Sequence, residues 1–295
     1  EILNREVHFF KTEPFTMTED SGFSGSFGTE TQFVGDNKNT NARIVYYLKK
    51  RHTFGKMEME IQDMDGNRIT TIAPGKSKGI NTVFWNFTGT NPKVAQAKTL
   101  AYGGFAAPRV PAGKYKVVLM KGNENYIQEI ELKYDDKSVT TLEQRKEQEA
   151  LTQTLYEMVE DLAFMVYEIN ETQAKALEVI ANNPKGKKDA QKLFDALENL
   201  RKDLVITTGD NYVASADPEL REKMADLYSN VATNFNKVSG ASKANYDLIS
   251  DEFSKAKKRY QEIMSKEGKR FYSFLEKNDI PKPELQNKED FLKKG

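Results

Sequence analysis

The acidic residues that could do acid–base chemistry gather around the first Asp-Gly pair. Glu58 and Glu60 alternate with methionine and isoleucine, which places both on the solvated face of one strand, and Asp65 with Gly66 is typical of a tight turn. A catalytic carboxylate pair needs two environments that separate its two pKa values, and here both carboxylates share one wet face. Asp63 and Asp65 also lack the further oxygen ligands of a calcium loop. We therefore predict no catalytic or calcium-binding site in this stretch.

Metal, thiol and nucleotide chemistry are equally disfavoured. The chain has no cysteine, which removes thiolate ligands, cysteine nucleophiles and disulfides, and it has two histidines, His8 and His52. Neither histidine falls in a helical stretch, where the Glu-x-x-His pattern of a di-iron bundle would need it. The chain carries no P-loop, no dinucleotide fingerprint and no Gly-x-Ser-x-Gly. We predict that it is not an enzyme and has no catalytic residue, cofactor or metal.

The candidate binding residues lie in a long connection instead. Residues 87–112 show little strand pattern, and this connection is longer than the usual loop between two strands of a compact domain. It carries Lys98, Tyr102, Phe105 and Arg109, an aromatic and basic set that could stack on a sugar ring or grip a protein partner. The alternative is a segment that covers the sheet edge and docks on a neighbouring domain. We favour this alternative over direct binding.

Composition excludes several classes of partner. Lysine plus arginine number 44 and aspartate plus glutamate number 44, so no net charge draws the chain toward nucleic acid or an anionic membrane. No apolar run approaches the roughly 18 residues of a transmembrane helix. The chain begins at Glu1, and we expect a mature product or a piece of something longer.

The sequence pattern changes near Thr140 from one typical of strands to one typical of helices. Before it, short alternating or β-branched runs separated by turn residues predict six or seven antiparallel strands in a sandwich over residues 41–136. Residues 1–40 contain phenylalanines among Gly, Ser and Thr, and we expect an extended connector that packs on a neighbour.

After Thr140 the pattern is helical. Thr140 and Glu143 form a capping box that opens a helix of roughly 40 residues. Three further amphipathic stretches follow, at about 189–206, from Asp217, and at about 242–277. Four amphipathic helices joined by short loops predict an up-and-down four-helix bundle over residues 138–280. A C-terminal tail follows at 281–295. The fold class is therefore α+β and multidomain.

The strand half resembles the immunoglobulin-like domain first described in flagellar hook-cap proteins. The resemblance rests on MEIQDMDGNRITTI, on GINTVFWNF and on PAGKYKVVLM, which opens the final hairpin. It implies an immunoglobulin-like sandwich with Trp85 as the core aromatic.

A second resemblance covers nearly the whole chain. REVHFFK, FVGDNKNTNARIVYYLK, KGINTVFWNF, APRVPAGKYKVVL and EQRKEQEALTQTLYEMVEDL are similar to the C-terminal region of bacterial sortilin-like proteins, often labelled glycosyl hydrolases with BNR repeats and common in Bacteroidota. In that family the region follows a large β-propeller, and this sequence contains no propeller repeat. Any glycosidase activity would therefore belong to the propeller.

The function expected is a non-catalytic scaffold or protein-interaction module of a secreted or cell-envelope protein. Its partners would be an upstream propeller of the same protein and other envelope or secreted proteins. The alternative is a carbohydrate-binding accessory module of a glycoside-active propeller protein, with Tyr102 and Phe105 as the stacking residues.

Overall fold

A computed structural model describes residues 1–18, 41–99, 106–209, 216–234 and 236–293. The chain is α+β, as predicted, and divides into two compact units. The β unit comprises residues 1–90 and 107–142, and the helical unit comprises residues 91–106 and 143–295. The chain therefore passes from one unit to the other three times.

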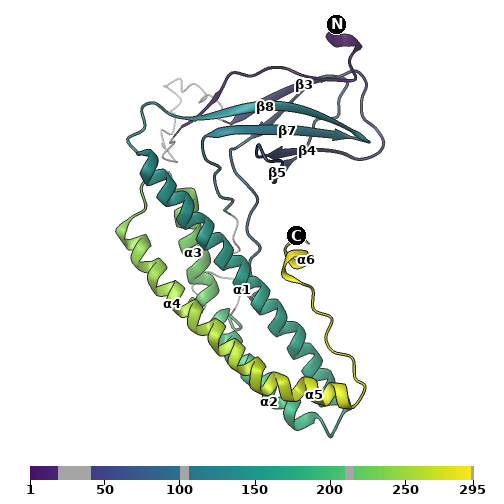
Figure 1. The fold of residues 1–295 in the computed structure, drawn as a ribbon, viewed down its shortest axis with the longest axis vertical. Coiled ribbons are helices and arrows are strands. Elements are labelled where there is room, and N and C mark those ends of the chain that lie inside the picture. Colours follow the sequence, from purple (N-terminus) through teal and green to yellow (C-terminus); the bar gives the residue numbers. More distant parts are fainter. Residues whose placement is uncertain (19–40, 100–105, 210–215, 235, 294–295) are drawn as a thin grey trace, which may run out of the picture. The chain divides into compact units, whose positions relative to one another are not determined.

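Two sheets form the β unit (Figure 1). The three-stranded sheet has the order β1-β3-β6 and contains β1 (Val7–Phe9), β3 (Ala42–Leu48) and β6 (Gly79–Trp85). The five-stranded sheet has the order β2-β8-β7-β4-β5 and contains β2 (Phe15–Met17), β4 (Met57–Gln62), β5 (Arg68–Ile72), β7 (Gly113–Lys121) and β8 (Glu124–Tyr134). β2 runs parallel to β8, and the other pairs are antiparallel.

Alternating side chains from both sheets build one core. Met57, Met59 and Ile61 of β4 are buried, whereas Glu58 and Glu60 between them lie on the outer face in ion pairs. The other large core side chains come from both sheets and include Ile44, Tyr46, Leu48, Trp85, Tyr115, Val117, Leu119 and Leu132. The period-2 prediction for this strand is thus confirmed.

Trp85 occupies the centre of this core, as expected. Its indole N–H donates to the carbonyl oxygen of Thr88 at 2.9 Å, so the polar end of the ring is satisfied. Its ring meets Tyr115 and Phe87 edge-on, at centroid distances of 5.5 and 5.9 Å.

The Asp-Gly stretch forms a turn, as expected. Asp63 Oδ1 accepts hydrogen bonds from the backbone N–H groups of Asp65 and Asn67, and Oδ2 accepts one from the Asn67 amide. Hydrogen bonds from Asn67 hold the pKa of Asp63 below its usual value. Gly66 has φ +90°, which suits glycine. The Asp63 carboxylate thus stabilises the turn.

The helical unit contains α1 (Leu142–Asn182), α2 (Lys187–Leu204), α3 (Leu220–Thr233) and α4 (Gly240–Ile263). A π-helical turn at Met264–Gly268 joins α4 to α5 (Lys269–Lys277), and α6 (Lys288–Lys293) follows near the C-terminus. One hydrophobic core is shared by α1 to α5, with fully buried residues that include Leu155, Leu162, Ile169, Leu193, Leu197, Tyr228, Phe253 and Phe271.

Helix α3 begins later than its sequence predicted. The Asp217 and Pro218 pair was expected to open the helix, yet the N-cap is Glu219 and the first helical residue is Leu220. Glu219 and Glu222 form a reciprocal capping box, which satisfies the backbone N–H groups of Glu222 and Glu219.

The tight join between α1 and α2 gives a first prediction. A Cβ atom on Gly186 would lie 2.3 Å from the Phe274 ring of α5, whereas one on Gly240 would meet no atom within 4 Å. Gly186→Ala should therefore lower the free energy of unfolding by about 1–3 kcal/mol through overpacking. Gly240→Ala, at the start of α4, should leave it unchanged or slightly higher. Urea unfolding followed by far-UV circular dichroism measures both, and equal stability of the two variants would contradict this packing.

Candidate functional site

Of the four predicted contact residues, the structure describes Lys98 and Arg109. Lys98 has an exposed side chain, and its backbone N–H donates to the carbonyl oxygen of Ile206 at 3.0 Å in the helical unit. Arg109 belongs to the β unit, where Nη1 donates to the carbonyl oxygen of Thr18 at 3.4 Å. Tyr102 and Phe105 lie outside the described residues. The sugar-binding alternative that rests on them stays a prediction.

The first part of the connection is a packing segment of the helical unit. The Lys93 backbone N–H donates to Glu160 Oε1 at 3.3 Å, and the buried Ala95 offers its carbonyl oxygen to Arg221 Nε at 2.8 Å. At its end, the Ala106 carbonyl oxygen accepts from the Tyr228 hydroxyl at 2.8 Å. Side chains of α1 and α3 thus hold the backbone of a segment that the sequence places between two strands.

A buried ion pair anchors this segment. Arg221 and Glu222 are 5% and 0% exposed, and Arg221 Nη1 lies 2.6 Å from Glu222 Oε1. Glu222 Oε2 also accepts from the backbone N–H of Glu219 at 3.3 Å. Arg221 therefore uses one nitrogen for the carboxylate and another for Ala95. A buried charge is tolerated only when its partner and hydrogen bonds are in place.

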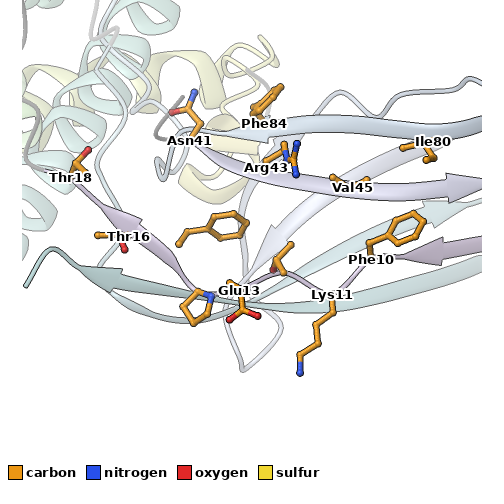
Figure 2. A pocket seen from close by; sticks show the side chains of 13 residues that line it. Phe10, Lys11, Glu13, Thr16, Thr18, Asn41, Arg43, Val45, Ile80 and Phe84 are labelled. Carbon is orange, nitrogen blue, oxygen red and sulfur yellow. The ribbon is translucent and has the colours of Figure 1, made fainter. Parts of the chain in front are cut away.

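A large hollow of the β unit lies where the first strand changes sheets. β1 pairs with β3 from Tyr46 to Leu48, and the Phe10 N–H donates to the Val45 carbonyl oxygen at 3.0 Å. The chain then leaves β3 and reaches β8 as β2. This departure opens a groove of about 1060 Å³ beside β3 (Figure 2).

Two contrasting walls line this groove (Figure 2). On one side Ile80 and Phe84 project from the outer face of β6, with 68% and 45% exposure. On the other, Lys11 and Glu13 come from the crossing segment, and Arg43 projects from β3 between the walls. The groove thus combines apolar surface with charges of both signs.

Within the described residues, the groove borders a strand edge and a buried hydroxyl group that have no partner. Because β1 ends opposite Tyr46, β3 from Ala42 to Ile44 has no strand beside it on that edge among the described residues. The Thr12 hydroxyl oxygen is buried and finds no partner within the same described part of the chain. Such edges accept an added strand.

The groove offers binding chemistry more than bond-making chemistry. Its one carboxylate, Glu13, has no histidine, cysteine or second carboxylate beside it among the lining residues. Across the described ranges, no group of three or more His, Cys, Asp or Glu residues is placed to hold a metal ion. His8 and His52 instead contact Arg5 and the Gly55 carbonyl oxygen.

A smaller hollow of about 320 Å³ lies among α2, α3 and α4. Its charged walls pair with one another: Lys223 lies 3.3 Å from Glu252, and Arg259 lies 2.5 Å from Asp203. These pairs leave little charge for a ligand, so the groove of the β unit is the stronger candidate.

Two partly buried carboxylates on α1 have pKa values above the usual value of a glutamate. Burial raises the pKa of Glu160, and hydrogen bonds from Lys93 and Tyr156 oppose that rise. Burial likewise raises the pKa of Glu168, which accepts a hydrogen bond from the Tyr260 hydroxyl at 3.3 Å. Both carboxylates face tyrosines whose own pKa values are also raised by burial.

Sequence reasoning missed the groove. A signal was present, because Ile80 and Phe84 alternate with the buried residues of β6 and so had to lie on its outer face. The departure of β1 from β3 gave no such signal.

No protein-family model, curated protein or solved structure significantly matches the chain. Within the residues that the structure describes, no helix has both the length and the apolar character needed to span a bilayer.

The buried ion pair makes a second prediction. Arg221→Met should destabilise the helical unit by about 3–5 kcal/mol, because Glu222 would remain buried without its partner. Lys223→Met is the matched control, since it breaks an exposed pair worth at most about 1 kcal/mol. Denaturant unfolding measures both variants. Similar losses from Arg221→Met and Lys223→Met would contradict a structural role for the buried pair.

Glu168 makes a third prediction, on pH. Since its pKa is raised in the folded state, wild type should lose stability as the pH rises from the ordinary carboxyl range through the higher folded pKa. Glu168→Gln removes the ionisation and should melt at a higher temperature than wild type at neutral pH. The two melting temperatures should converge in acid, where the carboxyl is neutral in both states. A constant difference across this pH range would show that the ionisation of Glu168 has no effect.

Proposed function

We propose that this chain is a non-catalytic protein-interaction module, built from an immunoglobulin-like sandwich and an up-and-down four-helix bundle. Following its resemblance to sortilin-like proteins, we place it as the C-terminal part of a larger secreted or cell-envelope β-propeller protein. In this role the helical unit is a rigid support and the β unit carries the binding surface.

Strand order supports the immunoglobulin-like assignment. The first strand is split between the sheets, as β1 beside β3 and β2 parallel to β8, and the remaining strands follow a β3-β6 and β8-β7-β4-β5 arrangement. Sandwiches of this class distribute consecutive strands between two sheets through such crossings. The four helices α1 to α4, which share one hydrophobic core, support the bundle in the same way.

The groove beside β3 carries the proposed function. It lies beside the edge of β3, with Arg43 and Val45 in its lining, and its rim presents Ile80 and Phe84 to solvent. An extended polypeptide partner could hydrogen-bond along that edge and place alternate apolar side chains on Phe84 and Ile80. Arg43 and Lys11 would favour acidic residues at the remaining positions.

Selection of extended peptides on the immobilised full chain tests this function. Peptides that bind wild type should lose about tenfold or more in affinity for Phe84→Ala, as expected of an apolar anchor. Phe54→Ala is the matched control, because Phe54 is 89% exposed and does not line the groove. Peptides that bind all three proteins equally, or a failure to select any peptide, would contradict the assignment.

A further inference from the structure

Strand β6 lies at one edge of the three-stranded sheet. It pairs with β3 over its whole length, from Gly79 to Trp85, and has no strand on its other side among the described residues. The strand contains no charged residue and no proline, and its pairing with β3 has no bulge. Charges, prolines and bulges are the features with which natural proteins keep edge strands from pairing with other chains. β6 therefore lacks the usual protection of an edge strand.

The register of the sheet shows which residues of β6 direct their backbone outward. The Phe10 N–H donates to the Val45 carbonyl oxygen at 3.0 Å, so Val45 directs its backbone groups toward the β1 side of β3. Successive residues of an antiparallel strand direct these groups to opposite sides. Tyr46 therefore directs its own groups toward β6, where it pairs with Asn81. It follows that the odd-numbered residues of β6 bond to β3.

The even-numbered residues of β6, which are Ile80, Thr82 and Phe84, direct their N–H and C=O groups away from β3. No residue of the described ranges forms a backbone hydrogen bond with these groups. Their side chains are exposed as well, to 68% for Ile80 and 45% for Phe84, and Thr82 lies exposed between them. The same three residues thus offer both hydrogen-bonding groups and apolar surface to a further strand.

The edge strand β5 of the other sheet differs from β6. It begins with the exposed Arg68, and its pairing with β4 is irregular between Ile61 and Gln62. The Thr90 hydroxyl also donates to the Ile69 carbonyl oxygen at 3.0 Å. Because a charge, an irregular register and an occupied carbonyl group all disfavour the addition of a strand, β6 is the more open edge.

We propose that β6 pairs with β6 of a second copy of this chain, antiparallel and centred on Thr82. In this register Thr82 lies opposite Thr82 of the second copy, and Ile80 lies opposite Phe84 of the second copy. A β-branched side chain beside an aromatic one is a favourable cross-strand pair. The arrangement has twofold symmetry, so the pair of Ile80 and Phe84 occurs twice.

Hydrogen bonding and charge decide the register. Centring on Thr82 pairs the three outward-facing residues with one another, so every outward N–H and C=O group gains a partner. Lys78 then lies opposite Asn86 of the second copy, and no like charges meet. A shift by two positions would place Phe84 opposite Lys78, or Ile80 opposite Asn86. The strand is thus complementary to itself in one register, which argues for a second copy as its occupant.

The size of the contact sets its strength. The 7 residues of β6 span roughly 23 Å, and one pair of such strands buries less than the roughly 1,200 Å² of a stable interface. Association is therefore weak and depends on protein concentration. The pairing uses the free backbone of β6, whereas the proposed peptide bonds to the opposite edge of β3, so it does not depend on the peptide-binding function.

Sedimentation equilibrium of the full chain tests the pairing. For wild type, the mean mass should rise with protein concentration. Thr82→Lys and Thr82→Glu should each raise the dissociation constant about tenfold, because two like charges face each other on the symmetry axis. An equimolar mixture of the two variants should associate again, since opposite charges then meet. Thr71→Lys and Thr71→Glu are the matched controls, because Thr71 is exposed on β5, and they should associate like wild type.

Disulfide formation in air is a second measurement, and it also locates the contact. Partners in a hydrogen-bonded antiparallel pair have Cα atoms about 5.5 Å apart, which a disulfide can bridge. Because the native chain has no cysteine, Thr82→Cys should form a covalent dimer faster than Thr71→Cys. The proposal is overturned by a wild type that stays monomeric up to about 1 mM. It is also overturned by charge variants that associate as tightly as wild type or fail to recover when mixed, or by equal cross-linking of the two cysteine variants.

Discussion

The helical unit depends on a charge pair that water does not reach. Arg221 divides its guanidinium between Glu222 and the carbonyl oxygen of Ala95, so one side chain joins α3 to a segment that the sequence inserts between two strands. In a low-dielectric interior neither charge is stable alone. Correct placement of residues 91–97 and correct folding of α3 therefore require each other. This mutual requirement favours one packing of residues 91–97 against α3 over others.

The β unit, in contrast, is stabilised by an apolar core. Its core is nearly all apolar, and its outer strand faces are wet, with charges such as Glu58 and Glu60 in surface ion pairs. The exception is the place where the first strand changes sheets, which leaves part of β3 without a neighbour. A sandwich tolerates such an edge when it is short. Among the described residues this edge of β3 is short, from Ala42 to Ile44.

Periodic features were readable from the sequence, and contacts across long separations were not. The alternation in β4 and the extent of α1 follow from spacing and propensity, which act locally, whereas the core position of Trp85 was implied by the resemblance. Docking of the 87–112 connection on a neighbouring domain was the favoured expectation, but the contact with Arg221 could not be identified, because Arg221 lies more than a hundred positions away. The groove depends on where β1 leaves β3, which hydrogen-bond register decides. The start of α3 was misplaced because two capping solutions competed and the Glu219–Glu222 box won.

The threefold crossing of the chain between its units has an evolutionary consequence. A domain encoded by one uninterrupted stretch can be duplicated, fused or lost by a single recombination event. Here no single cut in the gene separates the units, because residues 91–106 belong with the helices while their flanks belong with the sheets. The two units are therefore expected to be inherited together as one evolutionary building block.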